Sequence, residues 1–120
     1  MTDLKDTSDL GLIITKAPAE SGAVANALQM ARGAQFSGNR IALFLISDGV
    51  WLAKAGQKNR AFNEFCELLN KGVRVTLSQE HLEAAGMGRG ELVDGVDIVK
   101  KVYDEMVDQV MEQWNRVVVV

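Results

Sequence analysis

Polar side chains stand at the ends of the short apolar runs of this sequence, where a sheet of parallel strands would place its ligand-binding groups. In such a sheet the carboxyl ends of the strands lie along one edge, and ligands bind there. The hydroxyl, carboxylate and ammonium groups at these positions could bind a small ligand or a segment of a partner protein. Polar residues stand wherever strands meet solvent, so the set alone is weak evidence for catalysis. The residues are Thr15, Lys16, Ser47, Asp48, Ser78, Gln79 and Lys100.

Ser78 has two interpretations. As a nucleophile it would pair with His81, the only histidine of the chain, three residues later. A serine hydrolase usually presents its serine between glycines and uses an acid to orient the histidine. No glycine flanks Ser78 in Leu77-Ser78-Gln79. We therefore favour Ser78 as the N-cap of a helix, where its hydroxyl accepts a hydrogen bond from an amide of the first turn.

Metal and phosphate chemistry have little support in the sequence. One histidine and one cysteine cannot supply the spaced ligand pairs of a zinc site, and no loop carries a cluster of acidic residues. The glycine-rich stretch 86–90 follows an expected helix, whereas a nucleotide-binding fingerprint follows a strand. A helix cap and loop is the better interpretation of this stretch. We expect no metal and no cofactor.

Cys66 could carry sulfur or sense an oxidant, or it could be a small residue of the core. Phe62, Phe65 and Leu69 surround it at helical spacing, and free cysteine is among the most buried residue types. A reactive thiolate needs exposure and a cationic or helix N-terminal setting, but Glu67 follows Cys66 directly. The pattern favours a structural role.

The composition indicates one globular domain. The chain has 120 residues, 48% of them hydrophobic and 24% charged, and a net charge of −3. This charge gives no reason to expect nucleic acid or an anionic membrane as a partner. The N-terminus lacks the apolar segment of a secretion signal, and no apolar run is long enough to cross a bilayer. A single cysteine allows no internal disulfide, so we expect a reducing compartment, the cytoplasm.

Five expected strands alternate with helical patterns, which predicts an α/β fold. The apolar runs are too hydrophobic to be half exposed, and the last of them, at 116–120, is expected to be a buried strand. Alternation of this kind favours a three-layer α/β/α domain with a mainly parallel five-stranded sheet. Residues 1–9 are expected to be flexible, residues 10–120 to form the domain, and residues 50–56 to be a short helix or a loop. The expected strands are 10–15, 40–47, 73–77, 96–100 (which could instead begin a longer helix) and 116–120, and the expected helices are 21–37, 58–71, 79–85 and 102–114.

The order and spacing of several short motifs resemble the DsrE/DsrF-like family, which includes the sulfur-relay subunits TusD and TusC. The resemblance covers nearly the whole chain after residue 9. Each motif alone has low specificity, and the resemblance depends on the order and spacing of the motifs together. The motifs are Thr15 followed by Pro18, the small residues Ala25, Ala27 and Ala31 before Gly38, Asp48-Gly49-Val50, Gly72-Val73, Leu92-Val93-Asp94-Gly95-Val96 and Asn115-Arg116-Val117-Val118.

This resemblance implies a compact α/β/α domain that forms homo- or hetero-oligomers, such as trimers or hexamers, and often acts in sulfur transfer. Members that carry sulfur hold a cysteine at the end of the third strand. Alignment through Gly72-Val73 places Ser78 at that position. Serine cannot form a persulfide, so the chain is expected to be a member without the active thiol.

The leading hypothesis is a non-catalytic oligomeric binding or scaffold subunit, with a homo-oligomer or a sulfur-transfer protein as partner. Exposed apolar surface at Val50, Trp51 and Leu52 would support it. One alternative is a persulfide carrier that uses Cys66. Another is a small-molecule enzyme at the same edge, using Lys16, Asp48 or Lys100. The expected binding residues are Thr15, Lys16, Asp48, Gly49, Val50, Trp51, Ser78 and Gln79.

Overall fold

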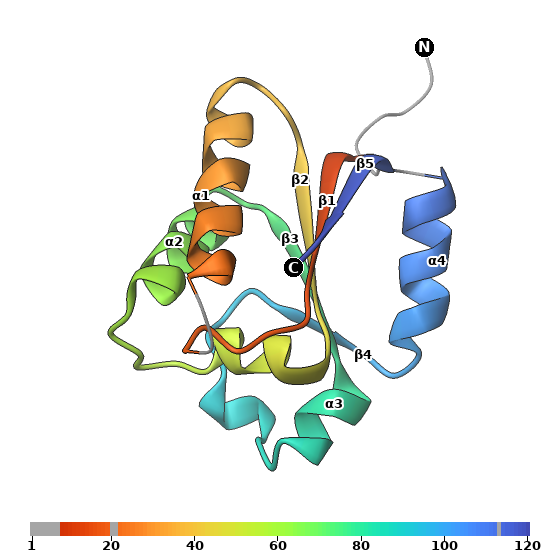
Figure 1. The fold of residues 1–120 in the computed structure, drawn as a ribbon. Coiled ribbons are helices and arrows are strands. Elements are labelled where there is room, and N and C mark those ends of the chain that lie inside the picture. Colours follow the sequence, from red (N-terminus) through yellow and green to blue (C-terminus); the bar gives the residue numbers. More distant parts are fainter. Residues whose placement is uncertain (1–7, 20–21, 113) are drawn as a thin grey trace.

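The strands of this protein form one parallel sheet in the order β4-β3-β2-β1-β5 (Figure 1). The computed structural model describes residues 8–19, 22–112 and 114–120. The strands are β1 (Ser8–Ile14), β2 (Ile41–Leu45), β3 (Arg74–Ser78), β4 (Asp97–Val99) and β5 (Trp114–Val119). The α-helices are α1 (Ala23–Phe36), α2 (Arg60–Asn70), α3 (Gln79–Ala84) and α4 (Val102–Glu112), and two 3-10 helices are η1 (Ser47–Ala53) and η2 (Arg89–Glu91).

The path of the chain explains why the helices divide between the two faces of the sheet. From β1 to β4 each new strand is added on the same side of the previous one. Right-handed crossovers then place α1 and α2 on one face. The step from β4 to β5 returns across the whole sheet, so a crossover of the same hand puts α4 on the opposite face (Figure 1). The result is the expected α/β/α architecture with five parallel strands.

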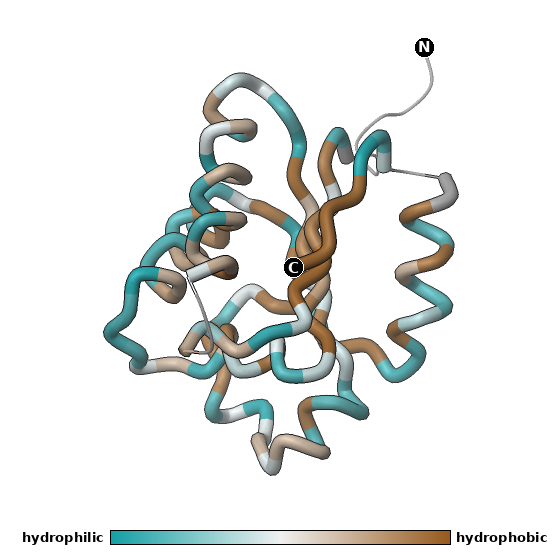
Figure 2. The backbone as a smooth tube through the Cα atoms, in the orientation of Figure 1, coloured by the Kyte–Doolittle hydropathy of each residue, from teal (hydrophilic) through white to brown (hydrophobic). Residues whose placement is uncertain are grey.

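The larger core lies between the sheet and helices α1 and α2. In α1 the buried stripe is made of small and branched side chains, Val24, Ala25, Ala27, Leu28 and Ala31. In α2 it is made of Ala61, Phe62, Phe65 and Leu68, while Cys66 and Leu69 are only partly buried at its margin. A smaller core lies under α4. In the hydropathy view the strands run through the centre of the molecule as its most hydrophobic segments (Figure 2).

Several boundaries differ from the sequence expectation. Strand β1 begins at Ser8, so two of the nine residues expected to be flexible belong to the sheet, and residues 1–7 lie outside the described part of the chain. Trp114, expected to end a helix, is the first residue of β5 and is buried against Phe44, with ring centroids 5.4 Å apart. The stretch 96–100 contains the strand β4 and does not continue as a helix.

The expectation of a buried C-terminal strand is wrong. β5 is an edge strand, and Val117 and Val119 are 38% and 64% exposed. Only Val118 and Val120 pack against the larger core. Four consecutive valines are apolar enough for a central strand, but the order of the strands leaves one side of β5 without a neighbour among the described residues.

Candidate functional site

A pocket of about 370 Å³ with a mixed polar and apolar lining lies at the carboxyl-terminal edge of the sheet, between the segments that follow β2 and β3. We call it the rim pocket. η1 contributes one wall and α3 the other, because each of these short helices begins where its strand ends. The pocket is lined by Ser47, Asp48, Trp51, His81, Ala84 and Ala85.

Ser78 closes β3 and begins α3. Its side chain is fully buried, and its Oγ accepts a hydrogen bond from the backbone amide of His81 at 3.2 Å. This amide is one of the first-turn donors that have no partner within the helix. The structure therefore confirms Ser78 as an N-cap. A hydroxyl that is buried and engaged in this way is poorly placed to attack a substrate.

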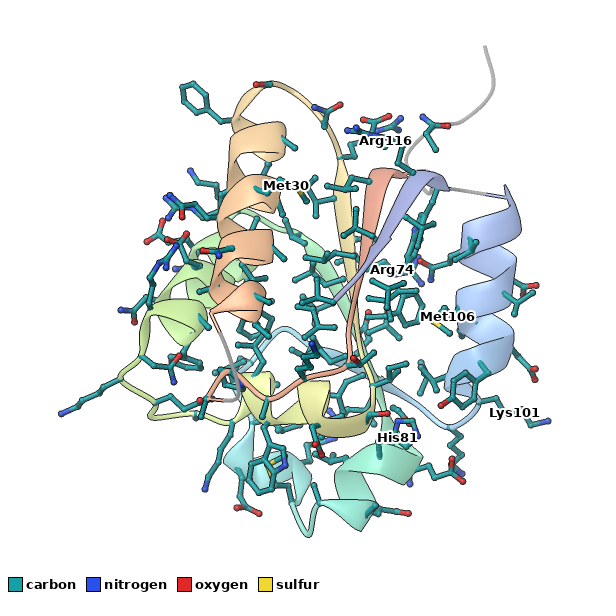
Figure 3. The ribbon with its side chains drawn as sticks, in the orientation of Figure 1. Met30, Arg74, His81, Lys101, Met106 and Arg116 are labelled. Carbon is teal, nitrogen blue, oxygen red and sulfur yellow. The ribbon has the colours of Figure 1, made fainter. Side chains whose placement is uncertain are left out.

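His81 links α3 to the end of β2. Its Nδ1 accepts a hydrogen bond from the backbone amide of Ser47 at 2.8 Å. On another side the ring meets α4, where Tyr103 packs edge-on at 5.9 Å between ring centroids and its hydroxyl lies 3.5 Å from Nε2. Figure 3 shows His81 at this edge of the sheet, beside α3.

Ser47 has an unusual backbone. Its φ is +51°, and it is the one non-glycine residue with a positive φ in the described part of the chain. A residue with a β-carbon costs roughly 1–2 kcal/mol in this left-handed region. Such conformations persist only where the surroundings impose them, and they concentrate at functional sites.

Three residues named from the sequence, Ser47, Asp48 and Trp51, line the rim pocket. Asp48 is exposed and Trp51 is half-buried at the pocket wall. Trp51 also lines a second, mostly apolar hollow of about 460 Å³ with the loop residues 17–19, and the Lys54 ammonium lies 5.7 Å from the centre of its ring. Trp51 therefore stands between the rim pocket and a mainly apolar hollow.

The remaining expected site residues have structural or solvent-facing positions. Thr15 donates its hydroxyl hydrogen bond to the Val120 carbonyl at 2.7 Å, which ties the end of β1 to the end of the chain. Gln79 donates to Glu83 at 3.1 Å along α3. Lys16 and Lys100, named in the enzymatic alternative, are exposed.

Gly49 and Val50 are buried and do not reach the pocket surface. A β-carbon at Gly49 would lie 2.0 Å from the carbonyl oxygen of Ile14, so glycine is needed for the close approach of η1 to β1. Val50 and Leu52 are both fully buried. The exposed apolar surface that would have supported the scaffold hypothesis is therefore absent at these two positions, and only Trp51 of the three is accessible.

His81, Ala84 and Ala85 were not expected to line the site. Sequence reasoning considered His81 only as a partner for a catalytic serine. A usable signal was present, because the only histidine lies one turn beyond the end of a strand. Its partner Ser47 is 34 residues away, and no local pattern announces that pairing.

Cys66 does not contribute to the rim pocket. It lies on α2, partly buried at the margin of the larger core. Burial raises the pKa of the Cys66 thiol, and the nearby negative charge of Glu67 adds to the effect. The thiolate, which is the reactive form, is therefore disfavoured at neutral pH.

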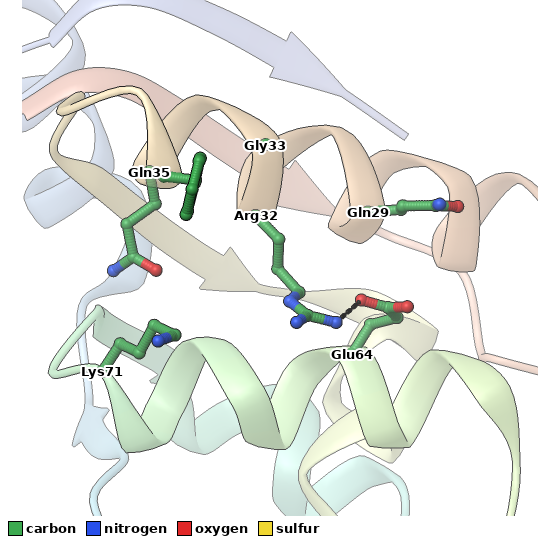
Figure 4. Close-up of a pocket in the computed structure, with 7 residues that line it drawn as sticks. Gln29, Arg32, Gly33, Gln35, Glu64 and Lys71 are labelled. Atoms are coloured by element: carbon green, nitrogen blue, oxygen red, sulfur yellow. Dashed lines mark hydrogen bonds and ion pairs between the residues drawn. The ribbon is translucent and has the colours of Figure 1, made fainter.

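A larger hollow of about 650 Å³ lies between α1 and α2 (Figure 4). Its central cation, Arg32, is paired with Glu64 at 2.6 Å between Nη1 and Oε1, and Glu67 lies 3.8 Å from its other terminal nitrogen. Since these acids neutralise Arg32, the hollow offers a ligand less free charge than its lining residues suggest. The rim pocket is the better candidate site.

Metal sites and membrane spans find no support in the described part of the chain. No group of three or more histidine, cysteine, aspartate or glutamate side chains lies together as metal ligands would within residues 8–19, 22–112 and 114–120. No helix in the same ranges has the length and apolar character needed to span a membrane.

These features define an α/β protein whose rim pocket lies at the carboxyl edge of a five-stranded parallel sheet. The model of the DsrE/DsrF-like family matches residues 8–118. The chain belongs to this family.

Individual proteins are also similar to this chain. The uncharacterized protein MK0008 of Methanopyrus kandleri is 30% identical over 91 residues, which cover 72% of this chain and 75% of that protein. The crystal structure of the ychN protein from E. coli superposes with a TM-score of 0.77 at 24% identity, over 95% of this chain and 100% of that one. MTH1491 of Methanobacterium thermoautotrophicum, a protein of unknown function, gives 0.69 at 23% identity, over 91% and 98%. At these identities the two solved structures show a shared fold alone.

Proposed function

We propose that this protein is a non-catalytic, oligomeric binding or scaffold subunit, related to sulfur-transfer proteins but without their active thiol. The observation that carries the proposal is Ser78. It ends β3, where the family resemblance places the cysteine of sulfur-carrying members, and its hydroxyl is buried and caps α3. A hydroxyl cannot hold a persulfide, so sulfur carriage at this position is chemically excluded.

The binding surface in this proposal is the rim pocket. Asp48 offers an exposed carboxylate there, and Trp51 offers an aromatic face beside it. An aromatic ring next to a few polar groups is a common composition for a small-ligand site or for the seat of a peptide segment. A small ligand or a segment of a sulfur-transfer protein would therefore be held by contact with this wall.

The oligomeric part of the proposal is supported by exposed apolar side chains on β5 and α4. Val117 and Val119 of β5 are 38% and 64% exposed, and Val107 and Tyr103 of α4 are 57% and 50% exposed. Exposed apolar side chains that gather in one patch commonly mark an interaction site, and we propose that an oligomer covers these. We propose a homo-oligomer, a trimer or a hexamer, and the single cysteine agrees with a reducing compartment such as the cytoplasm.

Two experiments test the proposal. Sedimentation equilibrium should give a mass several times that of one chain, and a strict monomer at all concentrations would contradict the oligomer. Incubation with a cysteine desulfurase and cysteine, followed by intact-mass spectrometry, should leave the wild-type chain unmodified. A gain of one sulfur atom that is lost in Cys66→Ser would instead support the alternative carrier.

Ser78→Cys is the matched variant for the second experiment. It places a thiol where the family resemblance locates the active one, with little change in side-chain volume. If this position is the family's sulfur site, the variant should gain sulfur under conditions in which the wild type does not. A variant that folds but stays unmodified would show that more than the thiol separates this chain from the sulfur carriers.

A further inference from the structure

The shape of the rim pocket depends on the turn after β2. This dependence holds whatever the pocket binds, so it does not rest on the proposed function. The wall formed by η1 begins with Ser47, whose φ of +51° is unfavourable for a residue with a β-carbon. The turn closes through a hydrogen bond from the Gly49 amide to the Ile46 carbonyl at 2.8 Å. That bond places Ser47 and Asp48 at the tip of the turn but gives the Ser47 amide no partner.

The Ser47 amide is one of the donors that the first turn of η1 leaves without an intrahelical acceptor. The residue at the N-cap, Ile46, has no side-chain acceptor to offer. The acceptor comes from a different element, because Nδ1 of His81 lies 2.8 Å from the Ser47 nitrogen. α3 therefore caps η1 across the pocket.

His81 is itself held in place by its neighbours. Ser78 fixes its backbone amide, Tyr103 packs edge-on against its ring, and its side chain is only 19% exposed. To accept from the Ser47 amide, Nδ1 must carry a lone pair, which places the proton of the neutral imidazole on Nε2. The ring is thus an acceptor toward the end of β2, and its protonated Nε2 faces the Tyr103 hydroxyl at 3.5 Å, while the Glu80 carboxylate, 4.0 Å away, lies beyond hydrogen-bond distance.

We propose that His81 is the positioning residue of the rim pocket. Its Nδ1 holds Ser47 in the left-handed conformation and thereby sets where Asp48 and Trp51 stand in the pocket wall. In this arrangement two hydrogen bonds connect the end of β3 to the turn after β2. Ser78 accepts from the His81 amide, and His81 accepts from the Ser47 amide.

The wild-type protein provides the first test, without any substitution. Long-range ¹H–¹⁵N spectra of the neutral ring should show the tautomer protonated at Nε2. The Ser47 amide should also be protected from hydrogen exchange although Ser47 is exposed. A proton on Nδ1, or an unprotected Ser47 amide, would overturn the proposal.

Two substitutions of His81 distinguish the role of Nδ1 from that of Nε2. His81→Asn places an amide oxygen near the position of Nδ1, whereas His81→Gln places its polar atoms near Nε2. If Nδ1 is the positioning atom, Asn should keep the Ser47 amide protected, and Gln should raise its exchange rate about tenfold, as expected for the loss of one hydrogen bond. Equal exchange in both variants would contradict the proposal.

Ser47→Gly tests whether the hydrogen bond to His81 holds Ser47 in the left-handed conformation. Glycine adopts a positive φ without strain, so the backbone signals of Asp48 and Trp51 should move less on His81→Gln in the Ser47→Gly background than in the wild type. Equal shifts in both backgrounds would mean that His81 does not hold Ser47. None of these readouts needs a ligand or an oligomer, so a failure of the proposed function leaves this inference standing, and a failure here leaves the proposed function standing.

Discussion

The Oγ of Ser78 accepts a hydrogen bond from the backbone amide of His81 at 3.2 Å, and this contact joins the end of β3 to the first turn of α3. Ser78 has no exposed surface. At the place where the family resemblance locates a reactive thiol, this chain therefore has a structural hydroxyl. Both the stability of α3 and the position of His81 depend on it.

Replacing Ser78 by alanine should lower the free energy of unfolding by about 1–2 kcal/mol, because one first-turn amide of α3 loses its acceptor in a buried setting. Urea denaturation measures this loss. Ser37→Ala is the matched control, since Ser37 is exposed after α1, and it should change stability by less than about 0.5 kcal/mol. Similar losses in both variants would mean that the Ser78 cap does not stabilise the fold.

Gly49→Ala should destabilise the protein by about 1–3 kcal/mol, the range for overpacking a tight contact. The added methyl group would lie 2.0 Å from the Ile14 carbonyl oxygen, which belongs to backbone and cannot rotate away. Gly33→Ala in α1 is the opposite case, because nothing lies within 4 Å of its added β-carbon. That variant should gain up to about 1 kcal/mol from helix propensity. Thermal or urea unfolding of the pair should give opposite signs.

Gly11 and Trp114 should behave as a coupled pair. A β-carbon at Gly11 would lie 1.8 Å from Cε3 of the Trp114 ring, which is buried under α4. Gly11→Ala should therefore cost more in the wild type than in a Trp114→Leu background, with a coupling free energy of about 1 kcal/mol or more. A double-mutant cycle by urea denaturation measures the coupling, and additive losses would contradict this packing.

Asp9 should contribute stability that depends on pH. Its Oδ2 accepts from the Arg40 amide at 2.8 Å, and this hydrogen bond, with smaller contributions from the Arg40 guanidinium and Asn115, lowers the pKa of Asp9 below its ordinary value of 3.8. A lowered folded-state pKa means that the contribution is present above about pH 4 and is lost as the pH falls through the folded-state value.

Asp9→Asn should thus be less stable than the wild type at neutral pH, and the difference should shrink in acid. The difference should stay below about 1 kcal/mol because the pair is close to solvent. Urea denaturation at several pH values measures it, with Asp94→Asn on an exposed loop as the charge-matched control. A difference that grows in acid would have the wrong sign for this interaction.

Local sequence patterns predicted most of the secondary structure. The apolar runs became strands, and the helical stripe with Val24, Leu28 and Ala31 became the buried face of α1. Ser78 could be assigned as an N-cap because capping depends only on residue type and position next to a helix. The family resemblance rested on the same short motifs, and it is confirmed over residues 8–118.

Contacts between residues far apart in the chain could not be predicted from the sequence. Nothing near Ser47 indicates that its amide will meet a histidine 34 residues away. The sequence left open whether Val50 and Leu52 are exposed, and the fold buries both of these η1 side chains. Four valines predict a strand, but not that the strand will stand at the edge of the sheet.

The sequence by itself determined the elements of this protein, because hydrophobic spacing and capping residues act within a few positions of each other. It also determined that no thiol stands at the end of the third strand. The tertiary structure decided which elements became neighbours, since the order of the strands and the side on which α4 crosses depend on how the whole chain returns over the sheet. That arrangement brings His81 to Ser47 and leaves Val117 and Val119 exposed.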